Sequence, residues 1–186
     1  MKNQLRAKIL ETQKRSYTAG TFEKINDQWV FFDEETDEAY PLEEYMNNDI
    51  SLYRNNRWRK GTLIEEGKFL SGKELIFIRD EEQVRIKKNL LYSLERLLDN
   101  LHDDTFYQFI TTLNAMDFSV YDCIYGYNQL SFSNSTQENG TNFFIFDNGE
   151  HICSIHHHFC QREKDRNRFE FTLNTGKRII IEKMLS

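Results

Sequence analysis

The chain has 186 residues, of which 39% are hydrophobic and 14% aromatic, and its formal net charge is −6 at pH 7. This length permits one domain or two small ones, and 15 Phe and 9 Tyr side chains provide enough large apolar surface for a packed core, which excludes a disordered chain. Residues 89–186 carry 8 basic and 13 acidic side chains. This acidic excess disfavours general binding to a nucleic-acid backbone, which needs a positive surface.

The cysteines and the N-terminal sequence predict a cytoplasmic protein. Cys123, Cys153 and Cys160 are odd in number and lack the spacing of a disulfide framework. The first ten residues are polar and charged throughout, unlike a signal peptide, and no apolar run has the length needed to cross a bilayer. We therefore expect reduced thiols and no membrane association.

The first 87 residues predict a helix followed by short strands. In residues 2–14, Leu5, Ile9 and Leu10 are the apolar positions of a short helix. Glycines and polar turn residues then separate extended runs, and the expected strands are 16–24, 28–33, 38–42, 52–60, 62–65, 74–79 and 84–87. This pattern predicts a small, strongly bent β-sheet or an SH3-like barrel.

The remaining residues predict two helices and an antiparallel sheet. Leucines in residues 90–101 recur at the i, i+3, i+4, i+7 spacing of one helical face. Asp103 or Asp104 is expected to cap a second helix, and the short connection predicts an antiparallel helix pair. Alternating apolar and polar residues then predict a β-meander with strands at 118–125, 127–132, 142–147, 151–160, 168–173 and 178–183.

The predicted fold class is therefore α+β. An N-terminal part, residues 1–87, combines a helix with a small bent sheet or barrel. A C-terminal part, residues 88–186, packs the helix pair on one face of the meander. The boundary falls near residue 87 without a flexible linker.

One segment, His151–Cys160, contains four of the five histidines and two of the three cysteines. On a strand, alternate residues share a face, so His156 and His158 lie together with Cys160 beyond them. Two imidazoles at this spacing can bind zinc when a neighbouring strand adds a ligand, but the sequence does not identify that ligand. The candidate metal ligands are His156, His158 and Cys160, and a solvent-facing sheet surface without metal is the favoured alternative.

The same segment permits a thiol hypothesis. Cys160 with His158, or Cys153 with His151, could form a thiol–imidazole pair for nucleophilic catalysis. Such a thiol needs a lowered pKa, and the sequence shows no helix N-terminus or basic pocket beside either cysteine. Buried structural cysteines are therefore favoured.

A second segment, Tyr53–Lys60, interleaves aromatic and basic side chains. The residues expected to contact a partner are Tyr53, Arg54, Arg57, Trp58 and Arg59. Tyr, Trp and Arg are enriched at protein interfaces, and rings beside cations also bind single-stranded nucleic acid. The order of preference is a solvated strand, then a protein partner, then nucleic acid.

The other features favour structural roles. The acidic run 33–38 lacks the ligand spacing and glycine of a calcium loop and predicts a solvated hairpin turn. The sequence has no Gly-rich phosphate loop, no nucleophile elbow, no His-Glu-x-x-His and no Cys-x-x-Cys. These absences disfavour an enzyme.

The stretch from Arg15 to Asp33, together with the Leu-rich helix, resembles an uncharacterised protein family of Bacillus-type bacteria. The resemblance implies a bacterial, cytoplasmic origin and brings no activity or functional residues with it. We therefore expect a non-catalytic interaction or regulatory module with a protein partner and no cofactor. The alternatives are a zinc-binding or thiol-dependent enzyme centred on His151–Cys160, and a weak single-stranded nucleic-acid binder through Tyr53–Lys60.

Overall fold

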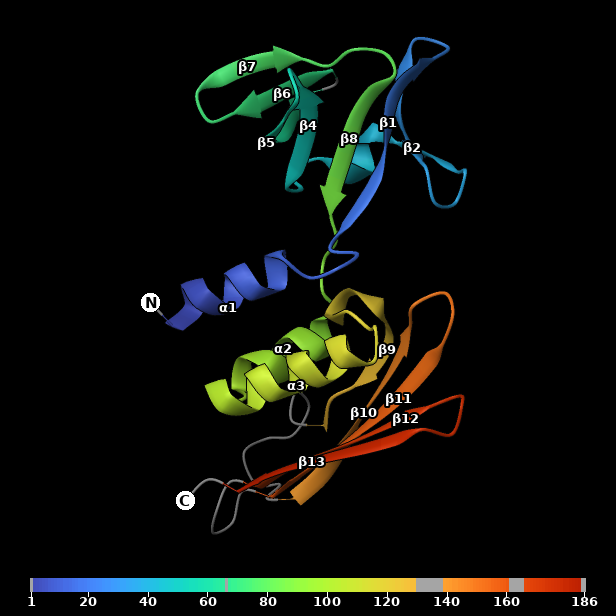
Figure 1. The fold of residues 1–186 in the computed structure, drawn as a ribbon. Coiled ribbons are helices and arrows are strands. Elements are labelled where there is room, and N and C mark those ends of the chain that lie inside the picture. The colour runs from blue at the N-terminus through green and yellow to red at the C-terminus, as the bar shows by residue number, and fades with distance from the viewer. Residues whose placement is uncertain (1, 66, 130–138, 161–165, 185–186) are drawn as a thin grey trace. The chain divides into compact units, whose positions relative to one another are not determined.

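A computed structural model describes residues 2–65, 67–129, 139–160 and 166–184 (Figure 1). The chain divides into two compact units. We call Ser16–Lys88 the β unit, and Met1–Arg15 together with Asn89–Ser186 the mixed unit. The sequence placed the N-terminal helix with residues 16–87, whereas the structure places it in the mixed unit.

The described part of the β unit is an antiparallel sheet in the order β3-β2-β1-β8-β4-β5-β6-β7. Because this order has two ends, the described strands form a bent open sheet and not a closed barrel. A short 3-10 helix, Leu42–Tyr45, follows β3. The strands are β1 Tyr17–Ile25, β2 Gln28–Asp33, β3 Ala39–Pro41, β4 Ile50–Arg54, β5 Arg57–Glu65, β6 Lys68–Ser71, β7 Glu74–Phe77 and β8 Glu82–Lys87.

Two glycines allow this sheet to bend around its core. A Cβ on Gly61 would lie 2.2 Å from the Leu70 carbonyl oxygen and 2.6 Å from the Phe69 ring. Gly20 has the same relation to its neighbours, since its Cβ would lie 2.0 Å from the Phe32 carbonyl oxygen. The missing side chains let the paired strands approach closely enough to enclose one core: Phe22, Phe31, Leu42, Ile50, Leu52, Leu63, Phe69, Ile76, Ile78, Val84 and Ile86.

The expected strand 52–60 is wrong, because the structure forms a hairpin there. Asn55 and Asn56 have φ angles of 52° and 59°, so they make a two-residue turn between β4 and β5. Asparagine tolerates this left-handed region better than most residues, and two such residues define a type I′ turn. The sequence also missed β6.

The mixed unit contains three helices and a five-stranded antiparallel sheet within its described residues. The sheet order, β13-β12-β11-β10-β9, is a meander, so the α+β class and the C-terminal meander are confirmed. The elements are α1 Lys2–Glu11, α2 Tyr92–Asn100, α3 Asp103–Ala115, the 3-10 helix Val120–Asp122, β9 Cys123–Tyr127, β10 Asn139–Asp147, β11 Ile152–Cys160, β12 Arg166–Leu173 and β13 Arg178–Met184.

Some expected boundaries in the mixed unit differ from the structure. Helix α2 begins at Tyr92, so Leu90 and Leu91 precede it, and His102 is the N-cap of α3 in place of Asp103 or Asp104. The sequence predicted strands at 118–125 and 127–132, whereas the structure has the strand β9 at Cys123–Tyr127. Residues 130–132 of the second lie outside the described residues.

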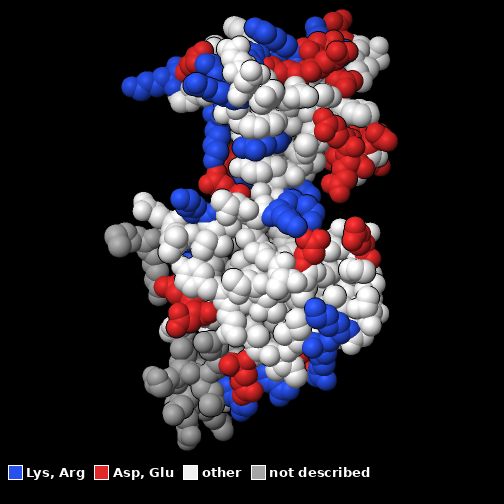
Figure 2. Space-filling model, viewed as in Figure 1, with Lys and Arg blue, Asp and Glu red and all other residues white. Residues whose placement is uncertain are grey.

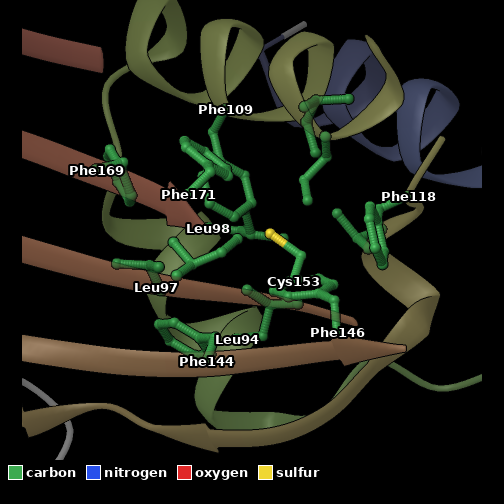
Figure 3. Packing of buried hydrophobic residues seen from close by; sticks show 14 of the residues in the cluster. Leu94, Leu97, Leu98, Phe109, Phe118, Phe144, Phe146, Cys153, Phe169 and Phe171 are labelled. Atoms are coloured by element: carbon green, nitrogen blue, oxygen red, sulfur yellow. The ribbon is translucent and has the colours of Figure 1, made fainter. Parts of the chain in front are cut away.

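The helices α2 and α3 and the inner face of the sheet share one apolar core (Figure 3). Leu94, Leu97 and Leu98 provide the buried face of α2 at the predicted spacing. Their partners include Phe106, Phe109, Ile110, Leu113, Phe118, Phe144, Phe146, Cys153, Ile155, Phe169 and Phe171. Because Phe residues come from strands as well as from a helix, the modest share of apolar residues still fills this core.

Helix α1 joins the mixed unit through Arg6. Its guanidinium donates to the carbonyl oxygens of Leu98 and Leu101 at 2.9 and 2.6 Å and to the Asp103 carboxylate at 2.8 Å. It also lies over the Phe106 ring, 4.6 Å from its centre. Arg6 thus satisfies carbonyl groups at the end of α2 and a carboxylate at the start of α3. The apolar spacing of α1 did not predict these contacts of Arg6 with α2 and α3.

We expect Gly61→Ala to destabilise the β unit by about 1–3 kcal/mol, because its new methyl group would force the backbone of β6 away from β5. Both tryptophans, Trp29 and Trp58, lie in this unit, so urea unfolding followed by tryptophan fluorescence measures its stability. Arg57→Ala, an exposed change in the same strand, is the control and should alter the unfolding free energy by less than about 0.5 kcal/mol. Equal unfolding midpoints for the two variants would contradict the prediction.

Candidate functional site

Strand β11 carries the cysteines and histidines on two opposite faces. Cys153, Ile155, His157 and Phe159 are buried, whereas His156 is exposed and His158 is half-buried. This is the alternation that the strand period predicts. His151 lies in the β10–β11 loop, before the strand begins. The three adjacent histidines therefore do not form one cluster.

The buried His157 is hydrogen-bonded on both ring nitrogens. Asn142 Oδ1 accepts from the Gln129 backbone N–H at 2.8 Å, so its Nδ2 is the donor to His157 Nδ1 at 3.1 Å. On the other side, His157 Nε2 donates to Asn167 Oδ1 at 2.7 Å. The ring also stacks on Phe169, with centroids 4.2 Å apart and planes within 8°. This arrangement requires the neutral tautomer protonated on Nε2.

Burial lowers the pKa of His157 to about 4. The loss of water around a charged imidazole is the largest cause, and the nearby His158 adds to it, while the hydrogen bond to Asn167 acts in the opposite direction. Protonation would also place an N–H on Nδ1 against the amide group of Asn142, which is itself a donor. His157 is therefore a structural, uncharged residue.

On the outer face, the structure brings a carboxylate to the two other histidines. His156, His158 and Glu170 each offer a ligand atom, and these atoms all lie within 4.8 Å of one another. Glu170 is on β12, directly across from His156 in the strand register. The sequence could not identify this residue, because its closeness to His156 depends on how the strands pair.

Both histidines of this outer cluster also contact β10. Thr141 is paired with His158, and its Oγ1 lies 3.1 Å from His158 Nδ1. Phe143 is paired with His156, and the two ring centroids are 5.0 Å apart. A polar contact thus orients one imidazole and an apolar contact supports the other.

Glu170 is shared by two arginines. Its Oε1 lies 2.6 Å from Arg168, and its Oε2 accepts a hydrogen bond from Arg178. The Arg178 contact is the main reason that the pKa of Glu170 lies below its ordinary value. The carboxylate therefore stays ionised over the whole neutral range, and only 13% of its side chain is exposed.

Cys160 does not join the cluster of His156, His158 and Glu170. It borders an open hollow of about 500 Å³ beside that cluster, together with Asn139, Gly140, Thr141, His158, Phe159, Arg166 and Arg168. No hydrogen bond connects these two described residues, Cys160 and His158. The predicted set of ligands thus changes by one residue, because Glu170 converges with the histidines and Cys160 does not.

The other two cysteines are structural. Figure 3 shows the Cys153 side chain pointing into the apolar cluster that includes Leu98 and Phe146. Burial raises the pKa of Cys153 to about 11 and that of Cys123 to about 12. A thiol with so high a pKa contains almost no thiolate at neutral pH, so it is a poor nucleophile.

The segment Tyr53–Lys60 forms one end of the β4–β5 hairpin, and its rings lie on the outer face of the β unit. Tyr53 and Trp58 are directly opposite each other, with ring centroids 5.0 Å apart, and are 38% and 40% exposed. The Arg85 guanidinium lies 4.6 Å from the centre of the Trp58 ring and 4.4 Å from that of Tyr17. We call Tyr17, Tyr53, Trp58 and Arg85 the hairpin surface.

Three predicted arginines of this segment have different environments. Arg54 donates to the buried Glu82 carboxylate and to the carbonyl oxygen of Phe77, so it stabilises the fold. Arg59 forms a 3.1 Å ion pair with Glu74. Arg57 is exposed near the turn. Arg85 and Tyr17, which the sequence missed, come from β8 and β1, and only the strand pairing brings them beside Trp58.

The acidic run is a hairpin turn, as the sequence predicts. Asp33 ends β2, and its Oδ1 accepts from the backbone N–H of Glu35 at 2.8 Å. Its own backbone N–H donates to the carbonyl oxygen of Glu38, which closes the turn before β3. Figure 2 shows acidic side chains gathered over this part of the β unit.

The fold and these surfaces define a two-unit α+β protein. Residues 4–183 match the family described as "Protein of unknown function (DUF2777)", and the chain belongs to this family. It is 29% identical to the Uncharacterized protein YisN of Bacillus subtilis (strain 168) over 177 residues, which are 95% of this chain and 90% of that protein. The resemblance to an uncharacterised Bacillus-type family is thereby confirmed. No solved structure matches the chain.

Among the described helices, none combines the length and the apolar character needed to cross a membrane.

We expect the stability of the mixed unit to fall as the pH decreases from about 6.5 to about 4. Within this window the unfolded chain protonates His157 and the folded chain does not, so each pH unit costs about 1.4 kcal/mol and the whole window about 3 kcal/mol. Urea unfolding followed by circular dichroism measures this slope. His157→Gln keeps a hydrogen-bonding side chain that does not titrate in this range, and it should reduce the slope. An unchanged slope would refute the assignment.

Alkylation with iodoacetamide tests the cysteines. Cys123 and Cys153 should react at least about a hundredfold more slowly in the native protein than in urea, because their raised pKa values remove the thiolate. Peptide mass spectrometry measures all three rates in one sample. Modification of Cys153 at the unfolded rate would contradict its burial. In the same experiment, a native Cys160 rate no faster than the unfolded rate would contradict the thiol-enzyme hypothesis.

Proposed function

We propose that this protein is a non-catalytic interaction module that binds a protein partner through the hairpin surface. The main observation is that the Arg85 guanidinium contacts both the Tyr17 ring and the Trp58 ring. Tyr53 on β4 lies directly opposite Trp58, and their rings are in contact. Cation–π contacts hold these groups in place before binding, so little side-chain freedom is lost on association. Trp, Tyr and Arg are also the residues that contribute most to interface energies.

The charge of the β unit favours a protein over nucleic acid as the partner. Ser16–Lys88 contains 11 basic and 16 acidic side chains. A polyanion would be repelled by the unit as a whole, whereas a short protein segment meets only the local positive charge of Arg57 and Arg85. The partner surface should therefore combine apolar side chains with one or two carboxylates.

We also propose that the protein is located in a reducing compartment such as the cytoplasm. All three cysteines are described and none forms a disulfide, which supports this location.

Quantitative binding tests the hairpin surface. A partner captured with the full chain and purified should bind Trp58→Ala at least about thirtyfold more weakly, because a buried interface tryptophan typically contributes 2 kcal/mol or more. Arg85→Met, which keeps an unbranched apolar side chain and removes the charge, should also weaken binding. Phe77→Ala is the matched control, since Phe77 is an exposed ring outside the hairpin surface. Calorimetry with the purified partner measures all three affinities.

Two outcomes would overturn the proposal. One is a partner that binds Trp58→Ala as tightly as the unchanged protein. The other is capture that a nuclease abolishes, which would show that nucleic acid is the ligand of this surface.

A further inference from the structure

We infer that His156, His158 and Glu170 form a binding site for one divalent transition-metal ion, with Zn²⁺ as the best match. The three side chains project from the outer face of two neighbouring strands, and their ligand atoms lie within 4.8 Å of one another. Two imidazoles and one carboxylate are a recognised ligand set for zinc. This inference is independent of the hairpin surface, because the residues belong to the other unit.

The observed spacing is close to that of a bound ion. Zinc bonds of about 2.0–2.2 Å in a tetrahedron place neighbouring ligand atoms about 3.4 Å apart, so the cluster must contract by roughly 1.4 Å or less. His156 is exposed, and His158 is half-buried. Rotation of these side chains can therefore close the gap without moving the strands.

Thr141 orients one of the imidazoles. Its Oγ1 lies 3.1 Å from His158 Nδ1, so an Nδ1–H can donate to this hydroxyl and leave Nε2 as the metal ligand. A metal-bound histidine almost always donates the N–H of its second ring nitrogen to an oxygen acceptor, which fixes the tautomer and the ring orientation. Phe143 supports the ring of His156 on the same side. The cluster thus has the supporting contacts that two exposed histidines alone would lack.

The two arginines beside Glu170 lower the affinity of the site for a metal ion, but they also hold the carboxylate in position. Arg168 contacts Oε1 and Arg178 contacts Oε2. A metal bound through one oxygen displaces one guanidinium, while the other arginine still holds the second oxygen and orients the carboxylate. The positive charge of both groups opposes the cation, so a variant without Arg178 should bind the metal more tightly.

The ligand chemistry selects the class of metal. Mg²⁺ and Ca²⁺ prefer oxygen ligands, whereas imidazole suits zinc and other late first-row ions. The hollow of about 500 Å³ that His158 borders gives space for water to complete the coordination. Cys160 lies at the border of this hollow and outside the converging group.

Calorimetric titration of the untagged full-length protein with ZnCl₂ tests the site. We expect one ion per chain, and Glu170→Gln or His156→Ala should lower the affinity at least about tenfold. Thr141→Val, which keeps the shape of the side chain and removes the acceptor, should lower it by about tenfold. Arg178→Gln should raise it. The increase in melting temperature on adding Zn²⁺ provides a second readout. This increase should become smaller in the variants that bind Zn²⁺ more weakly and larger in Arg178→Gln.

His151→Ala and Cys160→Ser are the matched controls and should bind as the unchanged protein does. His151 precedes the N-terminal end of β11, and Cys160 is the third candidate ligand from the sequence analysis, which lies outside the converging group. Circular dichroism of each metal-free variant separates a loss of ligand from a loss of fold. Binding that survives Glu170→Gln, or that disappears in Cys160→Ser, would overturn the assignment, as would a bound fraction far below one ion per chain.

Discussion

The hydrogen bonds of the buried His157 constrain the register of three strands. Asn142 on β10 and Asn167 on β12 are the partners of its two ring nitrogens, so β11 is fixed against both neighbours. A slip of one residue would turn His157 outward and carry His156 and His158 into the apolar core. Each buried polar group left without a partner costs about 1–3 kcal/mol, so the observed register is strongly preferred. The hydrogen bonds of His157 on the inner face therefore also place His156 and His158 on the outer face of the sheet.

In both units, single arginine side chains hold separate elements together. Arg6 joins helix α1 to the ends of α2 and α3, and Arg54 joins the β4–β5 hairpin to Glu82 on β8. Arg85 contacts two rings of the hairpin surface, Tyr17 and Trp58, with one guanidinium. Because a guanidinium has five donors and a flat face, one arginine can contact several elements. Basic residues in a sequence therefore cannot be assigned to binding until their partners are known.

Local patterns predicted the parts of this protein that depend on local physics. The leucine spacing located the buried face of α2, and the strand period separated His157 from His156 and His158, because both repeats reflect backbone geometry. The turn at Asn55 and Asn56 was missed, although two adjacent asparagines are a recognisable signal for it. Glu170, Thr141 and Arg85 could not be found in this way. Each meets its partner through the pairing of strands that are separate in sequence, and no periodicity encodes that pairing.

The two surfaces depend on different cores. The rings of the hairpin surface extend from strands whose inner faces pack around Phe22 and Phe31, whereas the outer histidine cluster extends from strands that pack on α2 and α3. The two cores share no residue, so we expect the effects of side-chain changes in the two surfaces to be additive. A loss of metal affinity without a loss of partner binding is then evidence about the cluster itself. The reverse result is likewise evidence about the hairpin surface, and a change that affects both must act through the fold.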